Sequence, residues 1–327
     1  VYKFDIRGSY AFNTNLQLSL QFRGGYSMRQ HRLYYNVPFV FNYNAKHEGY
    51  IKAELGKGNR ITTNQVAKDL LSQSELNEKE IDSVYNFKDN YLRITNHWRF
   101  CPKIAIEVGI VSHNRIAVSP EFYQSRGYPT QYKSVASALG IQWSPIGSKG
   151  PVLSVDYERS VKGMLGSNIN YERIELDAQS ILYASRRRSY SLRAGSGFYT
   201  KRGKHWNFVD YTNFHDNNIP GGWNDDWSGE FELLSSQWYN SSEYYVRTNF
   251  TYEAPMIVAA WVPLLGRYIE KERLYVSSLL VKNLHPYTEW GYGITTRLMT
   301  LGVFAAFRNE HFDGIGCRFG FELFRNW

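Results

Sequence analysis

The stretch "LQLSLQFR", residues 16–23, decides the fold class of this chain. Its apolar residues occupy every second position, and Gln, Ser and Arg fill the positions between them. Successive side chains of an extended strand point to opposite faces of a sheet, so this alternation predicts a β-strand with one apolar and one polar face. The same alternation returns in "YIKAELG", "KIAIEVGI", "LSVDYE", "YERIELDAQSIL", "YSLRAGSGFY", "YYVRTNFTYEA" and "PYTEWGYGITTRL".

Repetition of this pattern predicts an all-β chain. We count roughly 16 strands, which agrees with about ten residues for each tilted membrane-spanning strand. Only residues 62–82 have a helical pattern, a short segment in a long loop with Thr63 as its N-cap. A solvated sheet face would also carry charges, but so many long amphipathic strands favour a transmembrane antiparallel β-barrel of outer-membrane type over a soluble sandwich. We therefore predict a single barrel domain over residues 1–327.

Composition supports this prediction and excludes several other classes. Aromatic residues make up 17% of the chain, as in the aromatic girdles of membrane barrels. The longest strongly apolar run, residues 254–265, contains two prolines and is too short for a spanning helix. The net charge of +8 is spread along the chain, which argues against nucleic acid as a partner. Cys101 and Cys317 lie in separate strand-like segments and predict neither a disulfide framework nor a metal site.

Connections between the predicted strands are alternately short and long, as they are at the two rims of a barrel. Residues 61–90 and 113–133 are expected to be the long ones. Counting strands back from a periplasmic C-terminus places both long connections on the outer rim if residues 206–214 also form a strand. The first strand then runs inward. A closed barrel has an even number of strands with both chain ends on the periplasmic side, so we expect one or more strands upstream of Val1. The irregular stretch 253–275 is expected to lie along the inner membrane interface, or to be an ordinary long turn.

Charged residues recur on the polar side of the alternating stretches. In a barrel this side faces the lumen. The candidates for lumen-facing charged residues are Asp156, Glu158, Arg173, Glu175, Asp177, Arg193, Arg247, Glu253, Glu289 and Arg297.

The densest polar and aromatic stretch is "WNFVDYTNFHDNNIPGGWNDDWSGEF", residues 206–231. We predict a structured loop associated with the lumen or the rim, because turn-forming residues follow one another between aromatic anchors. Cation binding and acid–base chemistry are alternatives, although the spacing of its acidic residues matches no calcium loop. The loop candidates are Asp210, His215, Asp216, Asn217, Asn218, Pro220, Trp223, Asp225 and Asp226.

Other candidates for chemistry are few. His113, His205, His215 and His311 stand outside any G-x-S-x-G context. Arg186 to Arg188 fall in a short turn, where solvation and contact with anionic headgroups are both open. We therefore predict no catalytic residue, no metal and no cofactor.

The C-terminal third resembles a known family. The stretches "NFHDNNIPGGWNDDWSGEFELL", "YYVRTNFTYEAPMIVAAWVPLLGRYIEKERLYVSSLLV" and "HPYTEWGYGITTRLMTLGVFAAFRNEHFDGIGCRFGFELFRNW" resemble the C-terminal outer-membrane barrel of a Bacteroidota family of unknown function. Members typically carry an N-terminal carboxypeptidase-regulatory-like domain ahead of the barrel; residues 1–327 do not include it, in agreement with the expectation that Val1 is not the true start. The family has no established catalytic residues, so the resemblance implies no active site. The chain is also similar in architecture to assembly and translocation barrels of about 16 strands, with "SRGYP", residues 125–129, as the candidate for their Arg-Gly-aromatic loop.

The chain ends with "CRFGFELFRNW", whose alternation predicts a closing strand with Phe319, Phe321 and Leu323 toward lipid. The resemblance implies that the aromatic end, with Phe324 and Trp327, is the signal read by the barrel-insertion machinery. It also implies location in the bacterial outer membrane, with lipid and lipopolysaccharide around the protein and envelope proteins as partners.

Three functions remain open. The first is a non-enzymatic component or partner in outer-membrane protein assembly or transport, with a lumen closed by loops. The second is a diffusion porin that prefers anions because its lumen is rich in Arg and Lys. The third is a barrel hydrolase that acts at the outer rim.

Overall fold

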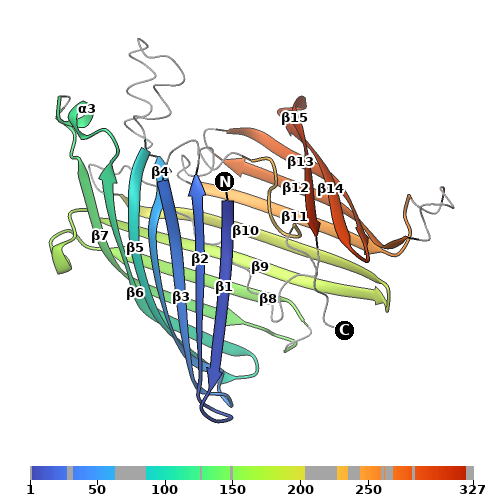
Figure 1. Cartoon of the computed structure of the whole chain (residues 1–327), viewed down its shortest axis with the longest axis horizontal. Helices are drawn as coiled ribbons and strands as arrows, with labels where there is room; N and C mark the ends of the chain where they lie inside the picture. Colours follow the sequence, from blue (N-terminus) through green and yellow to red (C-terminus); the bar gives the residue numbers. More distant parts are fainter. Residues whose placement is uncertain are drawn as a thin grey trace. The chain divides into compact units, whose positions relative to one another are not determined.

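The computed structural model describes residues 2–27, 32–62, 86–125, 127–147, 150–202, 227–234, 244–258, 261, 268–281 and 284–321. These residues form fifteen strands that neighbour one another in chain order (Figure 1). The strands are β1 (Tyr2–Ala11), β2 (Gln17–Ser27), β3 (Arg32–Asn44), β4 (Gly49–Thr62), β5 (Asn86–Cys101), β6 (Ile104–Ala117), β7 (Gln131–Trp143), β8 (Val152–Ser160), β9 (Tyr171–Ser185), β10 (Arg188–Arg202), β11 (Tyr244–Ala254), β12 (Ile269–Val281), β13 (Leu284–Thr296), β14 (Met299–Arg308) and β15 (His311–Phe321).

Helix is almost absent from the described residues. The α-helix α3 (Pro120–Ser125) and the 3-10 turn η2 (Met164–Gly166) lie in two connections between strands. Neither is long or apolar enough to cross a membrane, and the described part of the chain holds no helix that is. In the strand order β1 and β15 each have a single neighbour, so the described sheet is open.

The chain divides into two compact units. Unit 1 comprises residues 1–143, 155–174 and 198–210, and it contains β1 to β7. Unit 2 comprises residues 144–154, 175–197 and 211–327, and it contains β11 to β15 with the last part of β9, the first part of β10 and the turn between them. Within each unit the neighbouring strands pair antiparallel; for example, β5 pairs with β6 in unit 1 and β11 with β12 in unit 2.

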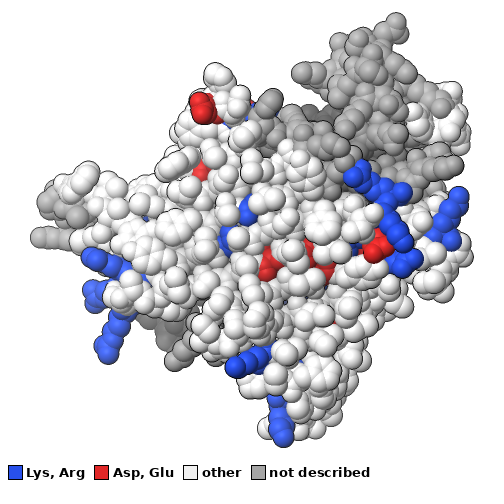
Figure 2. Space-filling view, turned by 180° about the vertical axis from the view of Figure 1, so that it is seen from behind, with Lys and Arg blue, Asp and Glu red and all other residues white. Residues whose placement is uncertain are grey.

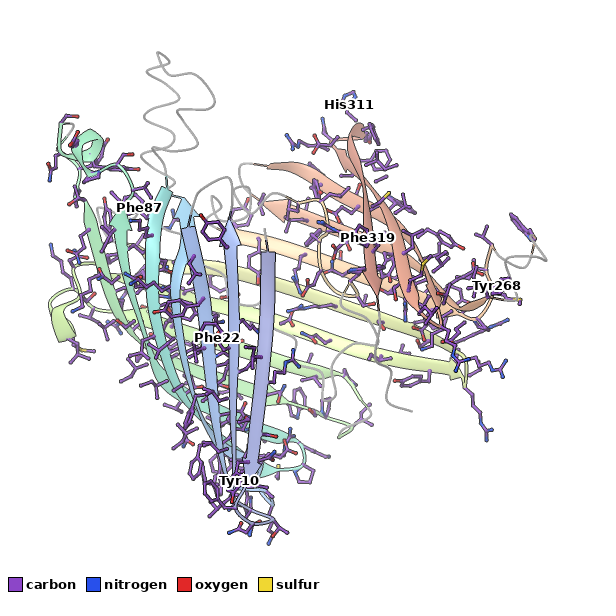
Figure 3. The ribbon with its side chains drawn as sticks, viewed as in Figure 1. Tyr10, Phe22, Phe87, Tyr268, His311 and Phe319 are labelled. Atoms are coloured by element: carbon purple, nitrogen blue, oxygen red, sulfur yellow. The ribbon has the colours of Figure 1, made fainter. Side chains whose placement is uncertain are left out.

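Burial alternates along the strands in the reverse sense to a water-soluble sheet. In β6 the side chains of Val108 and Ile110 are exposed, whereas His113 and Arg115 are buried. In unit 2, Figure 3 labels Phe319, which is 71% exposed on β15. We call the exposed, mainly apolar side of the strands the apolar face and the buried side the polar face. A soluble sheet turns its polar residues to water and its apolar residues to the core.

Aromatic side chains gather at one end of unit 1, where β1 joins β2, β3 joins β4 and β5 joins β6. Figure 3 shows Tyr10 at this end, and its ring lies 4.9 Å from the ring of Phe12. Tyr43 and Trp98 stack at 5.9 Å between β3 and β5. This band has the composition of an interfacial aromatic girdle.

Two expected connections are shorter than predicted. β4 continues to Thr62, and β6 continues to Ala117, where it still pairs with Phe87 of β5. His113 therefore lies in a strand opposite Tyr91 rather than in a long loop. The prediction was wrong there because main-chain pairing continues through a polar stretch that has no apolar alternation. The expected helix after Thr62 and the expected strand at 206–214 fall outside the described residues.

Candidate functional site on the polar face

One carboxylate faces two guanidinium groups at the centre of the polar face in unit 2. Nε of Arg193 donates to both carboxylate oxygens of Asp177 at 3.1 Å, and Nη2 of Arg247 lies 3.9 Å from Oδ1. Gln179 also donates to Asp177. All these side chains are buried, and β9, β10 and β11 each contribute to the group because their inward positions share one alternation. The low dielectric of a buried site strengthens such pairs, but each charge depends on its partner.

The same two arginines hold a segment of chain against the sheet. Residues 227–234, here called the docked segment, precede β11 in the sequence. Nη1 of Arg193 and Nη2 of Arg247 donate to the carbonyl oxygen of Gly229 at 3.4 and 3.3 Å. Nδ2 of Asn249 donates to the carbonyl oxygen of Glu230 at 3.3 Å. Gly229 has a φ of 81°, a left-handed conformation that glycine adopts without strain.

Glu289 of β13 holds the other end of the docked segment. Its carboxylate accepts the main-chain N–H groups of Glu232 at 2.8 Å and Leu233 at 2.9 Å. The hydroxyl of Tyr287 donates to the same carboxylate. Hydrogen bonds with an ionised partner are about twice as strong as neutral ones, and the two bonds of Glu289 are shorter than those that Arg193 and Arg247 donate to the segment.

Side chains of the docked segment pack on the same face. The ring of Trp227 meets Phe304 edge to face at 5.9 Å, beside Gly302. The ring of Phe231 lies 6.1 Å from that of Tyr287. Nε of Arg318, on the last described strand, donates to Glu232 at 2.9 Å. The segment is thus bound through its main chain and through two aromatic rings.

Further charges are paired near one end of unit 2. Glu253 accepts from Lys271 at 3.0 Å and from Nε of Arg273 at 2.8 Å. Nη1 of Arg273 then donates to the hydroxyl of Thr295 at 2.8 Å. The pairing follows the strand register, because Glu253 and Arg273 lie directly opposite each other.

The polar face of unit 1 carries a histidine–carboxylate pair. Nδ1 of His113 and Oδ2 of Asp89 are 2.8 Å apart, and Nε of Arg115 lies 3.6 Å from the other carboxylate oxygen. All three side chains are buried. A carboxylate that orients an imidazole is one part of many hydrolytic sites. Ser134 lies opposite His113 on β7, but it is fully buried, and its hydroxyl has no hydrogen-bond partner among the described residues.

A second buried ion pair lies in unit 1. Nη2 of Arg173 donates to Glu158 at 2.7 Å, and the hydroxyl of Tyr171 donates to the other oxygen of the same carboxylate. Nearer β4, the carboxylate of Glu54 accepts from Asn36 at 2.7 Å and from Tyr91 at 2.8 Å. The polar face therefore holds its charges in local pairs and triplets.

The structure places the predicted lumen-facing residues as follows. Asp156 is half-buried on the polar side of β8, and Arg297 is exposed in the turn between β13 and β14, not in a strand as predicted. The strand ends there because the hydroxyl of Thr296 accepts the N–H of Met299 at 3.2 Å and forms a turn. The others are buried in strands: Glu158, Arg173, Glu175, Asp177, Arg193, Arg247, Glu253 and Glu289.

Several predictions fall outside the described residues. These are the loop candidates Asp210, His215, Asp216, Asn217, Asn218, Pro220, Trp223, Asp225 and Asp226, and the terminal residues Phe324 and Trp327. Within the described ranges, no three His, Cys, Asp or Glu side chains form a group that could hold a metal ion.

Sequence reasoning missed Asp89 and Arg115 as partners of His113. The alternating apolar residues Leu92 and Ile94 in "NYLRIT" mark β5 and would have placed Asp89 on the polar side. It also missed the attachment of residues 229–233, because contacts to main-chain atoms leave no residue pattern in a sequence.

Two comparisons with known proteins bear on this arrangement. The model of a family of unknown function (DUF5686), C-terminal domain, matches residues 142–294, which is less than half of the chain. No curated protein matches the sequence.

A solved structure supplies the fold comparison. The chain is similar to BamA from Haemophilus ducreyi lacking POTRA domains 1–3, with a TM-score of 0.55 and 9% sequence identity over 97% of this chain and 67% of that chain. At this identity the similarity concerns the fold alone. It confirms the predicted fold class: the protein is an all-β chain whose antiparallel strands match an outer-membrane β-barrel, although the described strands do not close.

Proposed function

We propose that the protein is a non-enzymatic integral β-barrel protein of the bacterial outer membrane that works in outer-membrane protein assembly or transport, with an interior closed by its own chain. The docked segment carries this proposal. Its main chain is attached to Arg193, Arg247 and Glu289, all buried on the polar face. A pore that passes solutes needs a water-filled interior, whereas here the polar side chains are occupied by protein.

Location in the outer membrane is supported by the reversed burial of the strands and by the fold comparison. Exposed apolar residues on strands suit lipid, and buried charges suit a barrel interior. We propose lipid and lipopolysaccharide as the surroundings, the barrel-insertion machinery as the route of entry and envelope proteins as partners. A source in Bacteroidota and a carboxypeptidase-regulatory-like domain ahead of the barrel belong to the same proposal and rest on the sequence resemblance.

Planar-bilayer recording tests the closed interior. We expect the wild-type protein to give small or no steady conductance. The Glu289→Ala variant removes the acceptor of two main-chain N–H groups and should release the docked segment, which produces larger or fluctuating currents. Asp313→Asn is the matched control, because the pair of Asp313 with Arg308 is partly exposed and lies outside the segment. Large, stable channels from the wild-type protein would contradict the proposal and favour the anion-preferring porin.

Ion selectivity then separates the porin from the closed barrel. For a porin, neutralising Arg193 and Arg247 should reduce anion preference, while Arg297 should matter less because it lies exposed in a turn. In the closed barrel the two buried arginines bind Asp177 and Gly229, so neutralising them should lower the stability of the protein rather than change its ion selectivity.

The proposed partners are tested by identifying which envelope proteins purify with the full-length protein in mild detergent.

One observation favours a hydrolase as the second candidate, namely the 2.8 Å contact between His113 and Asp89. The proposed non-enzymatic role predicts that His113→Ala leaves any turnover of envelope lipid or peptide unchanged. His97→Ala, on the neighbouring strand β5, is the control. A loss of turnover in His113→Ala but not in His97→Ala would support the hydrolase.

A further inference from the structure

Three consecutive arginines form the turn between β9 and β10 in unit 2. Arg186, Arg187 and Arg188 are all exposed, and among the described residues none of their guanidinium groups forms an ion pair or side-chain hydrogen bond. Two arginines near the ends of other strands are paired: Arg99 lies 2.8 Å from Glu48, and Arg308 lies 2.9 Å from Asp313. Within the described ranges, three positive charges at one turn thus have no acidic partner. Figure 2 shows basic side chains that project at this edge of the molecule.

Exposed apolar and aromatic side chains adjoin this turn. Leu182, near the end of β9, is 61% exposed on the apolar face, and Tyr183, which points to the opposite side of the strand, is 70% exposed. Tyr190, two residues after Arg188, stacks on Tyr252 of β11 with ring centroids 5.0 Å apart. Because a strand rises about 3.3 Å for each residue, these side chains lie within about 15 Å of the guanidinium groups along the strands.

The connection between β11 and β12 adds a further aromatic group at the same strand end, since β11 runs antiparallel to β10. The side chain of Trp261 is 83% exposed, and the main-chain N–H of Trp261 donates to the carbonyl oxygen of Val258 at 3.0 Å. The N–H of Val258 in turn donates to the buried carboxylate of Glu272 at 2.6 Å. This end therefore presents an exposed indole on a hydrogen-bonded main chain, a tyrosine stack and three arginines. Trp and Tyr with basic side chains are typical of the membrane–water interface.

We propose that the β9–β10 turn is a binding site for anionic lipid headgroups, in which Arg186, Arg187 and Arg188 contact the lipid phosphate while Leu182 and Tyr190 contact the upper acyl chains. The inference rests on the proposed membrane location. The planar guanidinium group donates two parallel hydrogen bonds to phosphate oxygens, so three adjacent arginines suit this ligand well. A membrane is favoured over an acidic protein because the charges adjoin exposed apolar side chains on the same strands.

Mass spectrometry of retained lipid tests this site. The full chain is reconstituted in vesicles of phosphatidylcholine and phosphatidylglycerol, extracted in mild detergent, and analysed for the ratio of the two lipids that remain bound. We expect R186Q/R187Q/R188Q to lose phosphatidylglycerol enrichment by roughly tenfold or more, since each basic residue near an anionic surface contributes several-fold. R186K/R187K/R188K keeps the charge but lacks the planar fork, so its enrichment should be intermediate.

The control K46Q/K103Q/K162Q removes the same number of positive charges from exposed lysines in three separate turns. It should lose clearly less phosphatidylglycerol enrichment than R186Q/R187Q/R188Q, because charges in separate turns do not bind one headgroup together. Equal loss in this control, or an unchanged ratio in R186Q/R187Q/R188Q, would overturn the site. Tighter binding of polyglutamate than of phosphatidylglycerol, lost in the same triple variant, would assign the turn to an acidic protein instead.

Resistance to extraction by alkaline carbonate separates this inference from the proposed function. A wild-type protein that is extracted from the vesicles contradicts the membrane proposal itself. A wild-type protein that stays integrated but retains no excess of phosphatidylglycerol contradicts only the headgroup site. Heat-dependent mobility on gels verifies that each variant is folded before its lipid is counted.

Discussion

Asp177 neutralises the charges of two buried arginines on the polar face of unit 2. Its carboxylate is the shared partner of Arg193 and Arg247, and all three side chains are at most 3% exposed. Transfer of each ion from water into such a site costs several kcal/mol, which is offset only while opposite charges remain in contact. Removal of this carboxylate should therefore lower the stability of the fold more than removal of a single hydrogen bond.

Asp177→Asn should destabilise the protein by about 3–5 kcal/mol, because two buried guanidinium groups would then face each other without a carboxylate between them. Urea unfolding in lipid vesicles, followed on gels by heat-dependent mobility, measures the change. Glu172→Gln is the matched control: Glu172 pairs at 3.7 Å with Lys201, which is largely exposed, so its loss should cost less than about 1 kcal/mol. A similarly small loss of stability in Asp177→Asn would contradict the role of Asp177 as the carboxylate that neutralises Arg193 and Arg247.

Alternation in the sequence was sufficient to assign Asp177, Arg193 and Arg247 to one side of their strands, since the side of a strand depends only on parity. It could not show which of these charges meet. That depends on the register between strands, and a shift of one residue exchanges the two faces. Arg297 was misplaced for a related reason, because the turn at Thr296 is formed by a hydroxyl and by main-chain atoms.

At the level of elements, the docked segment fits its sheet only because β14 offers a glycine. A Cβ atom added at Gly302 would lie 2.8 Å from the Trp227 ring and equally close to the ring of Phe304. Both rings belong to a tight edge-to-face contact. Such rigid groups relax poorly, so a single methyl group at this position must displace one of them.

Gly302→Ala should therefore loosen the docked segment, at a cost of about 1–3 kcal/mol. Hydrogen exchange of the amides in residues 227–234 reports this directly, and faster exchange is expected in the variant. Gly314→Ala, on the adjacent strand β15, is the control, since nothing lies within 4 Å of a Cβ added there. Equal exchange in both variants would show that Trp227 does not depend on the space at Gly302.

The elements themselves were only partly predictable. Strands with alternating apolar residues, such as β2 and β10, coincide with the expected stretches. The end of β6 was not expected, because "SHNR" lacks apolar alternation and is held in the sheet by pairing with β5. The 206–231 stretch was expected to be a structured loop. Its described residues contact the polar face, and the remaining residues leave that prediction untested.

Over the whole molecule, the reversal of the two faces is the property that most constrains the surroundings of the protein. In β10, Leu192 is exposed while the adjacent Arg193 is buried. In β11, Phe250 is exposed while Arg247, on the other side of the strand, is buried. Composition and alternation were enough to predict this all-β, barrel-type fold, because both periodicity and aromatic content are global properties. They could not specify whether the interior is open, since that depends on segments without a repeating pattern.

Leu192→Arg tests the surroundings of the apolar face. In a bilayer a charge at Leu192, inside the apolar stretch of β10, should destabilise the protein by about 2–4 kcal/mol, whereas Thr200→Arg, on the same face near the end of the strand, should cost about 0–1 kcal/mol. Unfolding in lipid vesicles measures both changes. Effects close to zero for the two variants would indicate that this face meets water and would contradict a membrane barrel.

The docked segment is recognised mainly through its peptide groups: Arg193, Arg247 and Asn249 bind carbonyl oxygens, and Glu289 binds amide hydrogens. Every peptide presents these same groups, whatever its side chains. Most positions of the segment are therefore free to drift during evolution, while the four residues that bind it are not. A homologue that differs at most other positions of the segment but keeps Gly229, an aromatic residue at 231 and the four residues that bind the main chain is expected to fold this stretch in the same place.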